Sequence, residues 1–266
     1  MRLTRWHRFS TCAPYLVAQV FILCGKEQVT NLFHQKGEMD PIVVSGFPFD
    51  IDATALLANL RLDGDSEHAG IVRDMVRSAK AVARPKALCG VAYVQSRSDD
   101  GVVLDGVSFH SRVLAVNLKD AHRVFPYVAT CGREADAWSE AISDVLYRYW
   151  ADAIKQALLA CAFQAVRDFI ERHFQPGKTA RMNPGSLADW PTSQQGPLFQ
   201  LAGDPKSLIG VELTESCMMV PTKSVSGLLF PTETNFENCQ LCPRDPCPGR
   251  RAPYDEDLYA RKFDKR

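Results

Sequence analysis

The sequence lacks an excess of charge of either sign. Its 266 residues include 31 basic and 31 acidic side chains, so the formal net charge is zero. A protein that binds nucleic acid through bulk electrostatics usually has a basic excess, and a wholly disordered chain is usually poor in apolar residues. Because 46% of the residues are hydrophobic, we expect a buried core. Because the net charge is zero, we expect no nucleic-acid partner.

The sequence also has no apolar run long enough to cross a bilayer. The apolar run at 13–24 is interrupted by Pro14 and Gln19, and no A-x-A cleavage motif follows it. We therefore expect residues 1–38 to be a poorly ordered extension, or sequence upstream of a true start at Met39, and we expect no membrane partner. The nine cysteines are odd in number and mostly scattered among apolar neighbours, which favours a reducing, cytoplasmic compartment over a disulfide scaffold.

Arrangements typical of covalent catalysis are absent as well. The six histidines are spread along the chain, and no Ser-His-Asp or Cys-His pattern is visible. Covalent catalysis is therefore unsupported, and no catalytic residue is predicted.

The patterns that are present predict an α+β fold. Helical spacing occurs at 53–60, 67–84 and 133–175, and the last run is long enough to predict two helices or a kink. The β-rich runs between 86 and 130, including 112–118, predict a meander of strands. A loop is expected at 178–196, a short helical or turn segment at 197–203, and strand–turn–strand at 207–231. We expect helices wrapped around an antiparallel or mixed sheet in a domain over 40–235, followed by a cysteine-containing tail over 236–266, with 253–266 an exposed helix or disordered.

Two polar segments interrupt the second half of the chain. The first, RMNPGSLADWP, combines Arg181, a cation suited to bidentate carboxylate binding, with a Pro184–Gly185 turn that lets a ligand approach the backbone. The second, VELTESCMMVPTKSVSG, places Glu215 and Ser216 between apolar residues. Taken singly, each has a plain structural interpretation, a surface turn for the first and strand-end capping for the second.

Together the two segments resemble one family. The succession of an R-x-x-P-G turn, then L-T-E-S, then a Pro and V-S-G is similar to the activation domain of cobalamin-dependent methionine synthase, and closer to stand-alone proteins that carry this domain. The resemblance is strong over 178–230, weaker over 45–175, and does not include residues 1–38.

The resemblance implies a binding site for S-adenosylmethionine. Arg181 would pair with the methionyl carboxylate, Asn183 and Gly185 would offer backbone groups, and a family acidic contact would fall at Asp50 or Asp52. The family tyrosine after the glycine is Ser186 here. The implied ligand-binding residues are Arg181, Asn183, Pro184, Gly185, Ser186, Glu215 and Ser216.

Three further cysteines cluster near the C-terminus. Cys239, Cys242 and Cys247 form C-x2-C-x4-C, which is neither a complete zinc-ribbon pattern nor the ferredoxin spacing. Three thiolates could hold a 4Fe–4S cluster, with the fourth ligand from Cys217, a histidine or an outside molecule. Zinc and plain thiols remain alternatives.

The interpretation that joins these features is a reactivation factor for a corrinoid methyltransferase such as methionine synthase. The partner protein would hold cobalamin, and a flavodoxin or ferredoxin would supply electrons. No cobalamin, homocysteine or folate domain fits this length, so a complete synthase is not expected. An iron–sulfur electron carrier without adenosylmethionine binding and a zinc-stabilised interaction module stay open as alternatives.

Overall fold

Strand β7 (Arg123–Thr130) lies at the centre of the sheet. The computed structural model describes residues 19–20, 40–247 and 249–264. Every residue of β7 after the first is buried, as expected for a strand covered on both faces. One edge of β7 pairs antiparallel with β3 (Lys86–Cys89) and then β4 (Ala92–Arg97), and the other edge pairs with β11 (Ser224–Pro231).

The remaining strands extend the sheet outward from these pairs. β2 (Ile42–Val44) pairs with β3 and lies parallel to β1 (Gln19–Val20), while β5 (Gly101–Leu104) and β6 (Val107–His110) continue from β4. β8 (Thr179–Met182) pairs with β11 alone among the described residues, so it forms an edge of this nine-stranded sheet. A separate small hairpin consists of β9 (Glu212–Leu213) and β10 (Met219–Val220).

Most of the helices, but not α4 and α6, begin at a side chain that accepts a hydrogen bond from a first-turn N–H group, which would otherwise lack a partner. Asp52, Ser66, Ser111 and Asp144 provide such N-caps. The helices are α1 (Ala53–Asn59), α2 (Glu67–Val82), α3 (Arg112–Asn117), α4 (Arg133–Glu140), α5 (Val145–Phe174), α6 (Gln195–Ala202) and α7 (Pro205–Ile209). Short 3-10 turns occur at Thr192–Gln194 and Asn238–Leu241, and a π-helical turn at Tyr259–Phe263.

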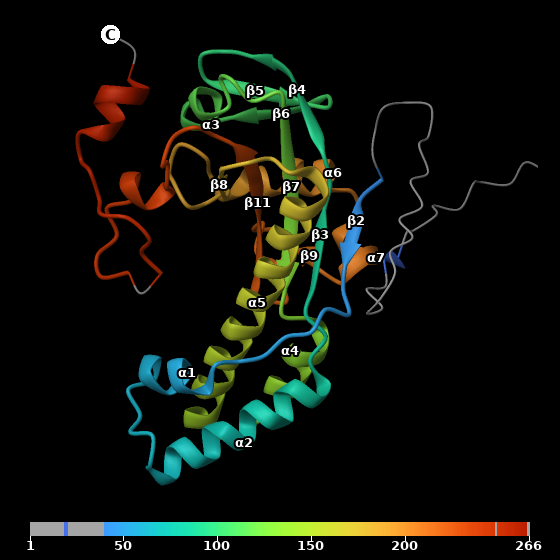
Figure 1. The fold of residues 1–266 in the computed structure, drawn as a ribbon, viewed down its shortest axis with the longest axis vertical. Coiled ribbons are helices and arrows are strands. Elements are labelled where there is room, and N and C mark those ends of the chain that lie inside the picture. The colour runs from blue at the N-terminus through green and yellow to red at the C-terminus, as the bar shows by residue number, and fades with distance from the viewer. Residues whose placement is uncertain (1–18, 21–39, 248, 265–266) are drawn as a thin grey trace, which may run out of the picture.

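Helix α5 belongs to two hydrophobic cores. Its first half packs with α1, α2 and α4 through residues that include Trp150 and Ile154. Its second half covers one face of β3 and β7 through residues that include Ala162 and Val166. Figure 1 shows α5 running from the sheet to the helices at the other end of the molecule.

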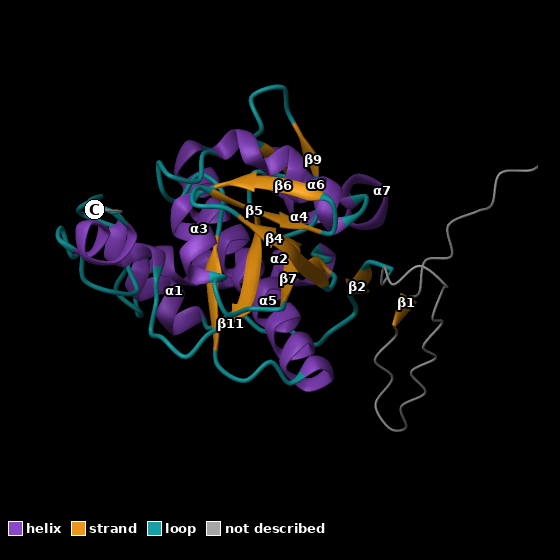
Figure 2. Ribbon diagram, turned by 90° about the horizontal axis from the view of Figure 1, so that it is seen from above, coloured by secondary structure: helices purple, strands orange, loops and turns teal. Residues whose placement is uncertain are grey.

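The opposite face of the sheet is covered by α6 and α7 at one end and by α3 at the other, as Figure 2 shows from above. The core beneath α3 also contains Phe236 and Phe263 of the C-terminal segment. The described part of the chain contains no helix that combines the length and apolar character needed to cross a bilayer.

The predicted fold class is confirmed, and so is the division of 133–175 into two helices, α4 and α5. Four local predictions were wrong. Residues 112–118 form helix α3 instead of a strand, 178–196 begins with strand β8, 207–231 begins inside helix α7, and Phe263 in the tail is fully buried. The prediction for residues 1–38 lies outside the described residues, apart from 19–20, and the boundaries 40–235 and 236–266 stay predictions.

Candidate ligand-binding site

Arg181 lies on the edge strand β8 and points to the face of the sheet covered by α5. Its neighbours Ala180 and Met182 are in the core on the other face, as alternation along a strand requires. The Arg181 guanidinium lies 4.4 Å from the centre of the Phe163 ring of α5, a cation–π contact. Among the described residues Arg181 has no ion pair or side-chain hydrogen bond, and burial lowers the pKa of this guanidinium.

Asn183 is fixed from below by two hydrogen bonds. Its Nδ2 atom donates to the Tyr127 hydroxyl and to the Ser226 carbonyl oxygen, at 2.7 Å in both cases. Tyr127 is fully buried on β7, and its ring lies 5.2 Å from that of Phe163. Gly227 is required beside them, because a Cβ there would lie 2.5 Å from Asn183 Nδ2. Tyr127 and Phe163 therefore support both predicted ligand residues from beneath.

Residues 183–186 form a tight turn. The Ser186 N–H donates to the Asn183 carbonyl at 3.1 Å, and the Gly185 N–H donates to the Trp190 carbonyl at 2.7 Å. Gly185 has a φ of 83°, and a Cβ on it would collide with the Thr192 hydroxyl. Pro184 is buried, whereas Gly185 and Ser186 are exposed. The turn thus presents backbone at the surface, as a close ligand approach needs.

The loop after the turn is tied to α3 by Asp189. Its carboxylate accepts hydrogen bonds from the Arg112 and Val113 N–H groups, at 3.2 and 3.0 Å, and from the Ser111 hydroxyl. A second tie joins the Ser226 hydroxyl to Gln195 Oε1 at 2.6 Å. Sequence analysis missed Tyr127, Phe163 and Asp189. Of these three residues, only Asp189 could have been proposed from the sequence, since it lies within the polar segment that contains Arg181.

Glu215 and Ser216 lie elsewhere, in the exposed loop between β9 and β10. This loop is closed by the Thr214 N–H, which donates to the Met218 carbonyl at 2.9 Å, and the Ser216 hydroxyl lies 3.0 Å from that of Thr214. Among the described residues no hydrogen bond, ion pair or ring contact joins Glu215 or Ser216 to 181–186. Their predicted role in ligand binding stays a prediction.

The two early carboxylates have structural partners. Asp52 accepts a hydrogen bond from Ala55 N at 3.0 Å and caps α1. Asp50 pairs with Lys80 at 2.6 Å, and this hydrogen bond lowers the pKa of the Asp50 carboxyl. The backbone carbonyl of Asp50 also accepts from the Cys161 thiol at 3.3 Å. The Asp52 carboxylate therefore holds the start of α1, and the Asp50 carboxylate is engaged with α2.

The cysteine loop is organised by the neighbouring arginines. Arg250 donates from its guanidinium to the carbonyls of Cys239 and Cys242, at 3.2 and 3.5 Å, and to that of Arg244. The Arg251 N–H donates to Cys239 Sγ at 3.4 Å. In the described residues no group of three or more His, Cys, Asp or Glu is placed to hold a metal ion. The predicted ligands Cys239, Cys242 and Cys247 are free thiols and do not fit a cluster in this arrangement.

Asn238, at the start of this loop, is an exception to the rule that buried polar groups are paired. The residue is 4% exposed, and neither its Nδ2 nor its Oδ1 has a hydrogen-bond partner among the described residues.

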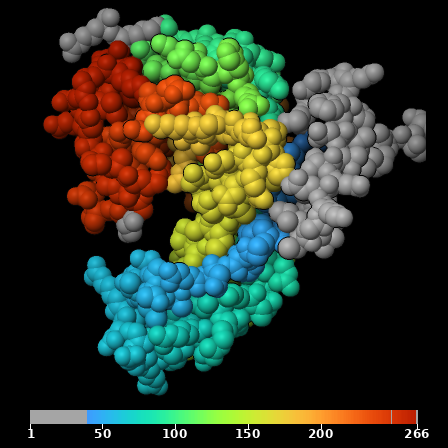
Figure 3. Space-filling model, viewed as in Figure 1, coloured from blue at the N-terminus to red at the C-terminus, as the bar shows by residue number. Residues whose placement is uncertain are grey.

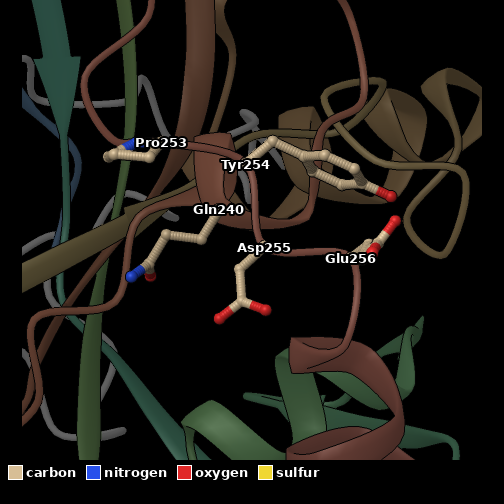
Figure 4. A pocket seen from close by; sticks show the side chains of 5 residues that line it. All are labelled: Gln240, Pro253, Tyr254, Asp255 and Glu256. Carbon is tan, nitrogen blue, oxygen red and sulfur yellow. The ribbon is translucent and has the colours of Figure 1, made fainter.

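Two surface hollows lie outside the predicted site. The larger, about 550 Å³, is in the C-terminal segment, where Gln240, Pro253, Tyr254, Asp255 and Glu256 line it (Figure 4). The smaller, about 250 Å³, includes Gly90, Asp105 and Leu201. Neither contains Arg181 or its turn. Figure 3 shows a separate notch in the surface, between the C-terminal segment in red and the region of α1 in blue.

Fold and site define the class of protein: an α+β domain that presents, at one edge of its sheet, a proline–glycine turn and an arginine with no ion-pair partner in the described part of the chain. The family model described as "Vitamin B12 dependent methionine synthase, activation domain" matches residues 85–242, and the chain belongs to this family. The recognition made from the sequence is confirmed. Among curated proteins, no match is found.

Comparison with solved structures supports the same fold. One similar structure is titled "Crystal Structure of the MetH Reactivation Domain bound to AdoHcy". It is 16% identical, with a TM-score of 0.57, and the alignment covers 76% of this chain and 82% of that one. At this identity the likeness establishes the fold alone.

Proposed function

We propose that the protein is a reactivation factor for a cobalamin-dependent methyltransferase such as methionine synthase, and that it binds S-adenosylmethionine at the turn after β8. Family membership supports the reactivation role. The observation that carries the ligand is Arg181, whose guanidinium is partly buried on Phe163 without a counter-ion among the described residues. A carboxylate ligand supplies the partner that such a cation lacks. The related structure holds AdoHcy, the adenosyl product of methyl transfer, according to its title.

The chain's own residues would bind and orient the donor. Arg181 would hold the amino-acid carboxylate. The 183–186 turn, fixed by Tyr127, would offer backbone carbonyls to the rest of the ligand, because the Gly185 and Ser186 N–H groups already donate within the loop. The ligand would supply a methyl group, which would pass from its sulfonium sulfur to the reduced cobalt of a corrinoid held by the partner protein and leave S-adenosylhomocysteine. Positioning and electrostatics are what this chain contributes, because the reactive atoms belong to the cofactors.

Calorimetric titration with S-adenosylmethionine tests the ligand. We expect saturable binding to the wild-type chain and a loss of at least about tenfold in Arg181→Met, the cost expected when a charged hydrogen bond is removed. Arg172→Met is the matched control, since Arg172 is exposed near the end of α5 and donates only to a carbonyl of its own helix. Equal affinity in Arg181→Met would contradict the proposed site. No heat at millimolar ligand would favour the alternative of an electron carrier.

A reactivation assay tests the partner. We expect the protein to restore turnover to an inactivated cobalamin-dependent methionine synthase that lacks its own activation domain, when S-adenosylmethionine and reduced flavodoxin or ferredoxin are present. Turnover that stays at the level of a reaction without the protein would contradict the proposal. Location in the cytoplasm follows from the same partner and stays a prediction.

An iron–sulfur cluster on Cys239, Cys242 and Cys247 also stays a prediction. Binding would require the loop to rearrange and Arg250 to leave its carbonyl partners. Protein purified without oxygen should then show a broad visible absorbance that bleaches with dithionite, and metal analysis should find iron and sulfide. Zinc without iron would instead support the interaction module, and no metal would support plain thiols.

A further inference from the structure

Helix α5 carries a second arginine beside the aromatic ring that supports Arg181. Phe163 and Arg167 are four residues apart on α5, so their side chains lie on the same face of the helix, one turn from each other. A long helical side chain lies over the turn that precedes it, which directs Arg167 toward Phe163. The Arg181 guanidinium lies 4.4 Å from the centre of that ring. The ring of Phe163 therefore has one arginine from the helix and one from the edge strand beside it.

Arg167 lacks a counter-ion in the described part of the chain. The residue is exposed, and it has neither an ion pair nor a side-chain hydrogen bond among the described residues. The carboxylate of the adjacent Asp168 accepts from Gln164 Nε2 at 2.7 Å instead. Glu171, one turn further along α5, is exposed and likewise forms no ion pair among these residues. Arg167 is thus free to bind an anion from outside the chain.

Two guanidinium groups in this arrangement repel each other. Burial lowers the pKa of the Arg181 guanidinium, and the like charges of Arg251 and Arg167 lower it further. Arg181 already lies partly buried against Phe163 without a counter-ion among the described residues. A single anion between the two groups would offset the repulsion and supply the acceptor that both lack.

We propose that Arg167 is a second ligand-binding residue, which together with Arg181 holds the carboxylate of the amino-acid ligand. The inference rests on the proposed function, because it takes S-adenosylmethionine as the ligand at Arg181. A carboxylate has two oxygens, and each oxygen can accept from a different guanidinium. Phe163 would form the floor of this subsite. Because Arg167 belongs to α5 and Arg181 to β8, the bound carboxylate would also join the helix to the edge of the sheet.

Decarboxylated S-adenosylmethionine, which lacks only the carboxylate, isolates this contact. In calorimetry on the full chain, we expect it to bind about tenfold more weakly than S-adenosylmethionine. In Arg167→Gln this penalty should fall to about threefold, because one of the two guanidinium groups remains. Arg172→Gln is the matched control, since Arg172 is exposed on another face of α5 and donates only to a carbonyl of its own helix. It should keep the full penalty.

The outcomes are distinguishable. A wild-type chain that does not bind S-adenosylmethionine fails the proposed function itself. If the wild-type chain binds it and Arg167→Gln keeps the full carboxylate penalty, the Arg167 assignment alone is overturned. If Arg167→Gln weakens both ligands by one common factor, Arg167 does not recognise the carboxylate, and the assignment is again overturned.

Thermal unfolding without ligand separates binding from a structural role. The melting temperature of Arg167→Gln should equal or exceed that of the wild-type chain, because the variant removes a like charge and no ion pair or side-chain hydrogen bond of the described residues. A lower melting temperature would show that Arg167 stabilises the fold, and it would overturn the assignment.

Discussion

At the scale of single residues, the site depends on an aromatic support beneath a cation. Arg181 rests on Phe163, and Phe163 packs against Tyr127, which in turn holds Asn183. A cation–π contact of this kind contributes about 0.5–2 kcal/mol. It does not replace the hydration that a partly buried guanidinium loses. A ligand that places a carboxylate at Arg181 and binds only the folded chain should therefore raise its melting temperature.

The Tyr127 hydroxyl provides a residue-scale test. Tyr127→Phe should lower the free energy of unfolding by about 1 kcal/mol, because Asn183 Nδ2 loses one of two hydrogen bonds. It should also weaken S-adenosylmethionine binding, since the Asn183 amide is no longer held in one orientation. Denaturant unfolding and calorimetry measure the two effects. Tyr93→Phe, at a side chain exposed to 47%, should change neither quantity. Wild-type stability in Tyr127→Phe would contradict this account.

At the scale of elements, short helix α3 depends on a distant carboxylate. Asp189 accepts from two N–H groups of its first turn, and Ser111 caps it from its own chain. Asp189→Ala should lower the free energy of unfolding by about 1–2 kcal/mol, because buried donors lose their acceptor. Asp120→Ala, at an exposed residue just after the same helix, should be neutral. Equal effects in the two variants would show that Asp189 does not cap α3.

The hydrogen bonds between Asp189 and α3 explain why sequence patterns predicted a strand, and not a helix, at this position. Residues 112–118 are rich in valine and leucine and favour a strand by propensity. The carboxylate that changes the outcome is 77 residues away from Arg112, a separation no local pattern can reveal. By contrast, the break between α4 and α5 was predictable from length, and Asp144 caps α5 from the adjacent position.

Part of the candidate site was also predictable from the sequence. Arg181 and the turn at 184–186 stand out by residue type, and their geometry agrees with a ligand-binding turn. β8 was missed because it is only four residues long, borders a proline–glycine turn and gains its hydrogen bonds from β11. In the sequence, Tyr127 and Phe163 look like ordinary core residues, because no neighbouring residue indicates which buried aromatic side chain lies beneath a cation.

At the scale of the whole molecule, two buried phenylalanines, Phe236 and Phe263, anchor the C-terminal segment. Phe263 is fully buried, although the surrounding tail is strongly charged. Phe263→Ala should lower the free energy of unfolding of the segment by about 3–5 kcal/mol, through lost burial and the cavity left behind. Hydrogen exchange should locate the loss of protection in 236–264.

A matched variant tests whether the effect comes from the buried position of Phe263 or from the loss of any aromatic residue in this segment. Tyr254→Ala removes a large aromatic residue from the same segment, where its side chain is 47% exposed, and should leave protection of 236–264 unchanged. If Phe263→Ala keeps wild-type protection of 236–264, burial of this ring does not anchor the tail.

Helix α5 has 30 residues, which corresponds to about 45 Å at the usual rise per residue. Its two halves are built into different cores. A hinge between the helical end and the sheet would have to break the continuous backbone hydrogen bonds of this rod. Both ends therefore turn as one rigid body. If the proposed corrinoid partner docks at the sheet edge, the movement that seats it has to come from the partner's own domains or from the loops.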